Sequence, residues 1–162
     1  MTMSTRLKAL LDENKVQYTL MTHSPAYTAQ AAAATLHVPG KELAKTIVVR
    51  AGEETSLAVL PASYRVNLTT LGAILGKTVR LATEQEFADL FPDCELGAMP
   101  PFGQLYNLSV YVDQALAADE EIVFNAGTHR DAIRMGYRDF ERLAKPKVCA
   151  FAEKAQSGLT AP

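Results

Sequence analysis

Two strand-forming runs joined by a short turn place the strongest constraint on the fold of this chain. Residues 46–49 (Thr-Ile-Val-Val) form a continuous β-branched run, which is typical of a buried central strand. Residues 52–54 (Gly-Glu-Glu) then reverse the chain, and residues 57–60 (Leu-Ala-Val-Leu) return as a second strand. The two runs predict a β-hairpin near the centre of a sheet, with Lys45 at the start of its first strand.

Capping residues and apolar spacing predict helices on both sides of this hairpin. Thr83 and Glu86 have the spacing of a capping box, which opens a helix whose apolar face is Phe87, Leu90 and Phe91. The other predicted helices are 5–14 after Ser4, an alanine-rich helix to Leu36 after Thr28, 68–75 after Asn67 and before Gly76, and about 138–143.

Further strands are predicted at 16–21, 79–81, 108–112, 122–124, around 133–137 and at 148–151. Neither repeats nor an internal linker separate these elements. We therefore predict a single-domain α+β fold with a mixed, mostly antiparallel central sheet surrounded by helices. We expect the domain to span 1–153 and residues 154–162 to form a frayed C-terminal tail, because they lack periodicity.

Composition excludes several classes of protein. The chain has 162 residues, is 48% hydrophobic and has a net charge of -2, which fits one soluble globular domain. Residues 1–14 lack an unbroken apolar segment, so neither a signal peptide nor a membrane anchor is expected, and we expect a cytoplasmic monomer. A nucleic-acid partner would need a local basic face, because the overall charge offers no attraction.

Familiar catalytic motifs are absent from the sequence. There is no nucleophile elbow, P-loop or dinucleotide-binding fingerprint, and the histidines lack metal-ligand spacing, so neither a cofactor nor a metal is expected. Cys94 lies between Asp93 and Glu95, whose charges raise a thiol pKa, and Cys149 lies in an apolar strand. A cysteine-dependent hydrolase is therefore the least favoured of the functions that we consider.

A proline-rich loop at residues 97–103 (Gly-Ala-Met-Pro-Pro-Phe-Gly) is the first candidate binding element. Two prolines fix the backbone and remove two donors, so contacts through N–H groups can come only from the other positions. An ordinary connector is the alternative interpretation. Lys45 and the 127–129 turn (Gly-Thr-His) are the other candidates, and each has a simple structural alternative as a solvated lysine or a turn histidine.

Taken together, these motifs resemble the YbaK-like aminoacyl-tRNA deacylases, which include the editing domain of bacterial prolyl-tRNA synthetases. The resemblance covers about residues 23–151. It rests on His23 with Thr28 and the alanine helix, on the 40–46 segment ending Ala-Lys-Thr, on the 97–103 loop, and on 127–129 followed by Asp139 and Phe140. It implies a mixed sheet surrounded by helices, in agreement with the elements predicted above.

The resemblance also implies a function: a trans-editing hydrolase that removes a wrongly attached small amino acid from the 3′ end of tRNA. Water would attack the ester with help from the neighbouring ribose hydroxyl, so no protein nucleophile is expected. By position, the implied catalytic residues are Lys45, Gly103 and His129, with Lys45 on the phosphate or ribose of the terminal adenosine. The implied substrate-binding residues are His23, Thr28, Thr46, Gly97, Ala98, Met99, Pro101, Phe102, Gly127 and Thr128.

Three questions stay open at this point. Thr46 follows Lys45 where some alanine-specific relatives have Asn, so alanine, serine, threonine and cysteine all remain candidate amino acids. A basic segment could face tRNA, or could be a solvated helix face, and its candidate contacts are Arg130, Arg134, Arg138 and Arg142. The alternative function is a non-catalytic member of the family that binds aminoacyl-adenosine-like ligands or an aminoacyl-tRNA synthetase.

Overall fold

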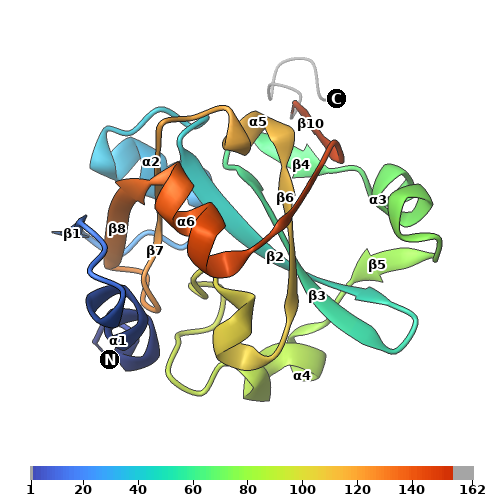
Figure 1. Ribbon diagram of the computed structural model, residues 1–162, viewed down its shortest axis with the longest axis horizontal. Helices are drawn as coiled ribbons and strands as arrows, with labels where there is room; N and C mark the ends of the chain where they lie inside the picture. Colours follow the sequence, from blue (N-terminus) through green and yellow to red (C-terminus); the bar gives the residue numbers. More distant parts are fainter. Residues whose placement is uncertain (1, 155–162) are drawn as a thin grey trace.

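An eight-stranded mixed sheet forms the centre of the protein, as seen in a computed structural model that describes residues 2–154 (Figure 1). The strand order is β1-β8-β7-β2-β3-β6-β9, and β5 pairs with β2. Four of the pairings are antiparallel and three are parallel, which confirms the predicted mixed class. The strands are β1 (Tyr18–Thr22), β2 (Leu43–Ala51), β3 (Glu54–Pro61), β5 (Val79–Leu81), β6 (Ser109–Asp113), β7 (Glu121–Asn125), β8 (Asp131–Gly136) and β9 (Lys147–Cys149).

The predicted central hairpin is confirmed and is longer than its β-branched segment. β2 and β3 pair antiparallel from Ala44 opposite Pro61 to Ala51 opposite Glu54. Most of β3 is buried, as expected for a strand with neighbours on both edges. The hairpin therefore forms the middle of the sheet, and Lys45 belongs to the ladder itself rather than preceding it.

Helices surround the sheet, and the predicted N-caps are confirmed. The side chains of Ser4, Thr28, Asn67 and Thr83 each accept a hydrogen bond from the first turn of the helix that follows. The capping-box helix ends at Phe87 after one turn and continues as a 3-10 turn, so it is shorter than predicted. The helices are α1 (Thr5–Glu13), α2 (Ala29–Leu36), α3 (Leu68–Leu75), α4 (Glu84–Phe87), α5 (Gln114–Ala117) and α6 (Tyr137–Ala144), with 3-10 turns η1 (Ala88–Leu90) and η2 (Gly103–Tyr106).

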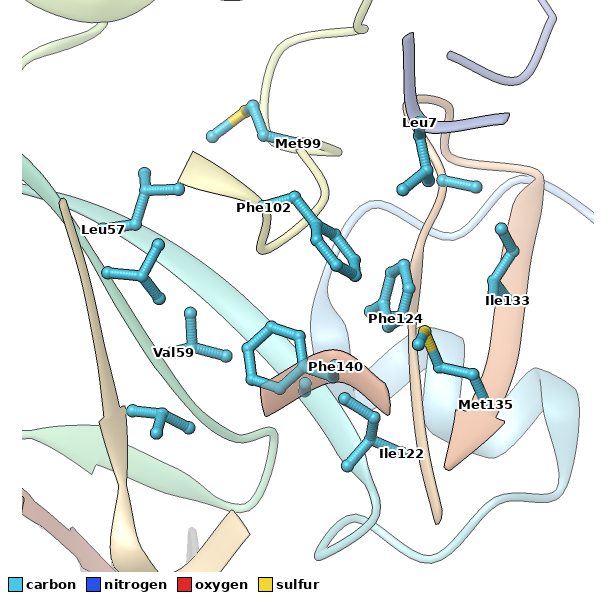
Figure 2. Packing of buried hydrophobic residues seen from close by; sticks show 14 of the residues in the cluster. Leu7, Leu57, Val59, Met99, Phe102, Ile122, Phe124, Ile133, Met135 and Phe140 are labelled. Atoms are coloured by element: carbon cyan, nitrogen blue, oxygen red, sulfur yellow. The ribbon is translucent and has the colours of Figure 1, made fainter. Parts of the chain in front are cut away.

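The main core lies on one face of the sheet, under α1, α6 and the chain that follows the proline-rich loop. Phe102 makes edge contacts with Phe124, at 5.6 Å between ring centroids, and with Phe140, at 5.4 Å (Figure 2). Two smaller clusters cover the opposite face, one under α2 and the other under α3. The sheet is therefore covered on both faces, and α2 and α3 cover different ends of the second face.

Two short strands were not predicted. β4 (Tyr64–Val66) and β10 (Ala152–Lys154) pair antiparallel as a separate two-stranded sheet. The predicted strand at 148–151 is interrupted because Asp113 accepts hydrogen bonds from the backbone of Phe151 and Ala152. Lys154 is the last residue of β10, and the rest of the predicted tail, residues 155–162, lies outside the described residues. No helix within residues 2–154 combines the length and apolarity needed to span a bilayer.

Candidate active site

The candidate site begins at a gap in the central sheet. On one edge of β2, β7 pairs with Leu43 and Ala44, and β5 pairs with residues 49–51, so residues 45–48 have no partner strand there. Backbone groups along a strand alternate between its two edges. The carbonyls of Glu42 and Val48 accept hydrogen bonds on this edge, so by the same alternation the N–H and C=O of Thr46 face the gap.

A cavity of about 360 Å³ occupies this gap. It is lined by residues from elements that are distant in the sequence, namely β2, the start of α2, the chain after β5, α4 and the proline-rich loop. Its lining is mainly apolar and includes Ile47, Leu81, Phe87 and Met99, and its polar members are Tyr27, Thr28, Lys45, Thr46, Glu84 and Asn125. An apolar cavity with a few polar groups is the usual form of a small-ligand site.

Lys45 is the one lysine in the lining of this cavity. Its Nζ lies 3.4 Å from the carbonyl oxygen of Ala62, and no carboxylate pairs with it within residues 2–154. Partial burial lowers the pKa of Lys45 from its usual value. The cavity therefore contains a cationic group without a paired carboxylate, although Glu84 also belongs to the lining, and an anionic part of a ligand can pair with it.

The proline-rich loop and the 127–129 turn are hydrogen-bonded to each other. Gly127 donates its N–H to Ala98 O at 3.0 Å, and Glu95 donates its N–H to Gly127 O at 2.7 Å. His129 adds two contacts: its N–H donates to a carboxylate oxygen of Glu95 at 2.9 Å, and its Nε2 lies 2.8 Å from Leu96 O. Two of the motifs singled out in the sequence thus form one structural unit.

His129 lies beside the cavity rather than in its lining. A second hollow, of about 340 Å³, is lined by Pro25, Tyr27, Glu95, His129 and Arg130. Tyr27 lines both spaces and packs its ring against that of His129 at 4.8 Å between centroids. The backbone of Gly97 borders His129 from the cavity side, since a Cβ on this glycine would lie 3.5 Å from its Cε1.

Within the proline-rich loop, Gly97 and Met99 line the cavity, whereas Ala98, Pro101, Phe102 and Gly103 lie outside its lining. Phe102 is fully buried in the main core. Gly103 packs against a neighbouring backbone segment so closely that a Cβ there would lie 2.2 Å from Leu108 O. The structure thus divides this predicted group into cavity residues and packing residues.

The remaining predicted binding residues occupy three kinds of position. Thr28 and Thr46 line the cavity, and the Thr28 side chain also caps α2. Thr128 is buried, and its hydroxyl donates to Asp131 at 2.8 Å while accepting two backbone N–H groups of the same turn. His23 lies outside both spaces, and its N–H donates to the carbonyl oxygen of Arg130 at 2.8 Å, which ties the 23–28 segment to the 127–130 turn.

Of the four predicted tRNA-contact arginines, Arg130 is the one that lies at the site. Arg134 lies within 4 Å of Glu42 and Glu121, at 3.7 and 3.6 Å, and Arg142 pairs with Asp139 at 3.2 Å. Arg138 is exposed on α6 and lines a separate hollow near the end of β8. The basic segment therefore does not present four arginines to one surface point.

Neither cysteine is placed for nucleophilic catalysis. Burial raises the pKa of Cys94 to about 12, and the charge of Asp93 adds to this effect. Burial likewise raises the pKa of Cys149, which lies on β9. A thiol needs a low pKa to attack at neutral pH, so both residues are poor nucleophiles.

Sequence reasoning missed several lining residues. Tyr27 directly precedes Thr28, and this position beside a recognised motif residue was the available signal. The spacing of Phe87 predicted a place on the apolar face of a helix. Phe87 does pack against the core, and it also lines the cavity. No sequence signal marked Ile47, Leu81 or Asn125. Their contribution to the lining depends on the residues at which the pairing of β2 with β5 and with β7 ends.

Comparison with known proteins identifies the class to which this fold and site belong. Residues 23–143, most of the chain, match the model of the aminoacyl-tRNA editing domain. The chain belongs to this family. The matched segment begins at His23 and contains Lys45, the proline-rich loop and His129.

Individual relatives cover nearly the whole chain. It is 28% identical over 156 residues to the multifunctional Ser/Thr-tRNA deacylase ProXp-y of Escherichia coli (strain K12), with 93% of each protein covered. It is 24% identical over 143 residues to the prolyl-tRNA editing protein ProX of Acetoanaerobium sticklandii, covering 85% of this chain and 87% of ProX. The crystal structure of a proposed trans-editing enzyme for prolyl-tRNA synthetase superposes with a TM-score of 0.79 at 22% identity, covering 93% and 96% of the two chains, which shows a shared fold.

Proposed function

We propose that this protein is a trans-editing deacylase, which hydrolyses the ester between a wrongly attached small amino acid and the 3′ end of tRNA. The observation that carries the proposal is the cavity in the gap of the sheet, where Lys45, the Thr46 backbone edge and Gly97 meet an apolar wall. Membership of the aminoacyl-tRNA editing family and the deacylase relatives support the same reaction.

In the proposed reaction the oxygen of a water molecule bonds to the ester carbonyl carbon, and the bond from that carbon to the ribose oxygen breaks. The leaving ribose oxygen takes up a proton, and the neighbouring ribose hydroxyl of the substrate assists the attack. An activated ester needs only modest help from the protein. This agrees with the high thiol pKa of Cys94 and the absence of a nucleophile elbow.

Lys45 supplies the cationic contact in this proposal. Its ammonium group would hold the ribose or phosphate of the terminal adenosine, which brings the ester into the cavity. Support comes from its position in the lining and from its weak hydrogen bond to Ala62 O, 3.4 Å long, which a stronger acceptor can replace. Burial in the cavity wall also makes a charged contact stronger than one in water.

Gly97 is the donor best suited to the developing oxyanion. Its N–H points to the thioether sulfur of Met99, 3.2 Å away, and sulfur is a weak acceptor that a substrate oxygen can displace. By contrast, the N–H of Ala98 already donates to Glu95 O at 3.0 Å. One preorganised oxyanion donor contributes about 3 to 4 kcal/mol to catalysis.

The apolar wall provides selection by size. A synthetase site separates amino acids that differ by one methylene by only about 1 to 3 kcal/mol, so a second site that admits the smaller product restores fidelity. Phe87 and Met99 would limit the length of the side chain that fits beside Lys45. Alanine, serine, threonine and cysteine are the proposed amino acids. We further propose that the protein acts in the cytoplasm as a monomer on free aminoacyl-tRNA, or on tRNA presented by a synthetase.

The decisive experiment is hydrolysis of a panel of tRNAs mischarged with these four amino acids. We expect the wild-type protein to deacylate at least one of them, and Lys45→Ala to lose most of that activity while remaining folded. Lys77→Ala is the matched control, because this exposed lysine follows α3 and lies outside the cavity lining. A wild-type protein that hydrolyses no member of the panel would contradict the proposed function.

A further inference from the structure

Tyr27 is an unusually exposed aromatic residue at the mouth of the site. Its relative exposure is 74%, the highest among the exposed large hydrophobic residues within residues 2–154, and it lies in the segment between β1 and α2. It lines both the cavity that contains Lys45 and the hollow that contains Arg130. A ligand that extends from one space into the other therefore passes this ring.

The ring of Tyr27 is supported from one side. It packs on His129 at 4.8 Å between centroids and 48° between planes, and His129 itself is only 8% exposed. His129 is fixed in turn by its contact with Leu96 O at 2.8 Å. A ring that rests on a fixed neighbour and has most of its surface in solvent offers a flat apolar surface, and a nucleic-acid base can stack on such a surface.

Arg130 gives the same hollow a cationic group. It is exposed and forms no ion pair within residues 2–154, in contrast to Arg134 and Arg142. Glu95 also lines the hollow, but its carboxylate accepts the N–H of His129 at 2.9 Å, so it is held toward the turn. A planar guanidinium beside an exposed aromatic ring matches the phosphate and the base of one nucleotide.

We infer that Tyr27 and Arg130 form a nucleotide subsite next to the aminoacyl cavity, with the terminal adenine stacked on Tyr27 and its 5′ phosphate bound by Arg130. The inference rests on the proposed function, which puts the aminoacyl ester in the cavity. The terminal base is assigned because it is joined directly to the esterified ribose and Tyr27 is itself part of the cavity lining. Because Arg130 binds the phosphate in this arrangement, Lys45 contacts the ribose of the same nucleotide.

Binding of uncharged RNA tests the subsite without requiring hydrolysis. The probe is a fluorescently labelled acceptor-stem hairpin that ends in single-stranded ACCA, and its partner has the same sequence with an abasic terminal ribose. We expect the wild-type protein to bind the ACCA hairpin about tenfold more tightly than the abasic one, and Tyr27→Ala to lose this difference. Tyr27→Phe should retain it, because stacking needs the ring and not the hydroxyl.

Matched variants separate this subsite from general effects on the surface. Ile74→Ala removes another exposed hydrophobic side chain, on α3, and should leave the preference for ACCA unchanged. Arg130→Ala should weaken both hairpins about equally and reduce the salt dependence of binding, whereas Arg65→Ala on β4 should do neither.

Two outcomes would overturn the subsite: a wild-type protein that binds the two hairpins equally well or not at all, or Tyr27→Ala with an intact preference for ACCA. The failures of the two proposals are distinguishable. A protein that deacylates tRNA but shows no effect of Tyr27 retains the proposed function and loses the subsite. One that shows the effect of Tyr27 but hydrolyses no mischarged tRNA retains the subsite and loses the proposed function.

Discussion

The imidazole Nε2 of His129 lies 2.8 Å from the carbonyl oxygen of Leu96, so the histidine turn holds the chain that leads into the proline-rich loop. The ring of Tyr27 packs against the same side chain. His129 is buried, and its Nδ1 has no partner among the described residues. These contacts favour a positioning role, in which His129 fixes the wall of the site.

We predict that His129→Ala destabilises the protein by about 1 to 3 kcal/mol, because it leaves Leu96 O without its side-chain donor in a part-buried setting. Urea unfolding measures this loss. His37→Asn is the control, since His37 caps α2 in a left-handed conformation that asparagine tolerates, and it should change stability little. Equal stabilities of His129→Ala and the wild-type protein would show that the Leu96 contact contributes nothing.

A second prediction concerns the pH dependence of deacylation. Burial lowers the pKa of Lys45, so its ammonium loses the proton at a lower pH than a free lysine does. Activity that needs this charge is present below the lowered pKa and falls as the pH rises through it. Lys45→Arg should retain some activity and shift the alkaline fall to higher pH, because a guanidinium stays charged. The measurement is kcat/KM as a function of pH for both proteins, after subtraction of spontaneous ester hydrolysis. If the activities of the wild-type protein and of Lys45→Arg fall at the same alkaline pH, Lys45 is not the titrating group.

A third prediction separates folding from catalysis at Gly103. A Cβ at this position would lie 2.2 Å from Leu108 O and 2.7 Å from a methyl group of Val110. Gly103→Ala should therefore cost about 3 kcal/mol or more, through overpacking against the backbone. Gly52→Ala, in the open turn between β2 and β3, loses only the left-handed freedom of glycine and should cost about 1 to 2 kcal/mol. Loss of activity in Gly103→Ala with unchanged stability would instead support a direct role in catalysis.

Local signals in the sequence were sufficient for most of the elements but not for their arrangement. Ser4, Thr28, Asn67 and Thr83 marked helix starts correctly because a cap is a contact within four residues. The strands β4 and β10 were not predicted, and each is defined by its pairing with the other, which lies more than eighty residues away in the sequence. Parallel pairing, such as that of β3 with β6, depends on contacts between distant segments that no local pattern encodes.

For the site, too, individual residues could be predicted from the sequence, whereas their arrangement around a cavity could not. Lys45 and Gly97 were chosen from motifs and do line one cavity, although more than fifty residues separate them. The cavity itself exists because β7 and β5 leave β2 at different residues, and that gap has no signature in the sequence. For the same reason Gly103 and Phe102 could not be distinguished beforehand from the loop residues that face the cavity.

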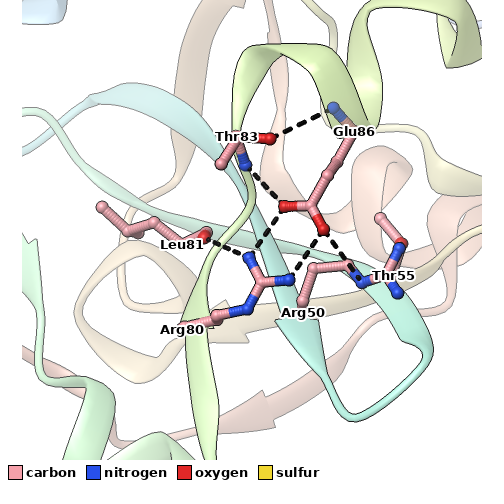
Figure 3. A network of polar contacts seen from close by, with 6 residues as sticks. All are labelled: Arg50, Thr55, Arg80, Leu81, Thr83 and Glu86. Atoms are coloured by element: carbon pink, nitrogen blue, oxygen red, sulfur yellow. Dashed lines mark hydrogen bonds and ion pairs between the residues drawn. The ribbon is translucent and has the colours of Figure 1, made fainter.

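A fourth prediction concerns the polar network that holds α4 beside β5 (Figure 3). Arg80 donates two hydrogen bonds of 2.7 Å to Glu86, and the N–H of Thr83 donates a third, of 2.9 Å. Arg80, and then Thr83, lower the pKa of Glu86 to about 2. A lowered carboxyl pKa stabilises the fold above the unfolded pKa, about 4.3, and this contribution is lost as the pH falls toward 2.

Glu86→Gln should therefore be less stable than the wild-type protein at neutral pH, and the difference should shrink as the pH falls from about 4.3 to 2. Urea unfolding across this range measures the effect. Glu53→Gln, in the exposed hairpin turn, is the control, because Glu53 forms no ion pair within residues 2–154. A difference between wild type and Glu86→Gln that stays constant with pH would contradict the assigned pKa.

The last prediction tests whether the apolar wall sets the size of the accepted amino acid. Phe87 follows Glu86 on α4, so the network above positions a side chain that lines the cavity beside Met99. Phe87→Ala enlarges the cavity on this side. It should raise kcat/KM for tRNA charged with a larger amino acid, such as valine or leucine, relative to alanine by roughly tenfold, the discrimination expected for about one methylene. Phe151→Leu, a change in a separate buried cluster outside the cavity lining, is the control for loosened packing and should leave the ratio unchanged. If Phe87→Ala lowers the rates for all amino acids in proportion, the ring supports the structure of the site without selecting its substrate.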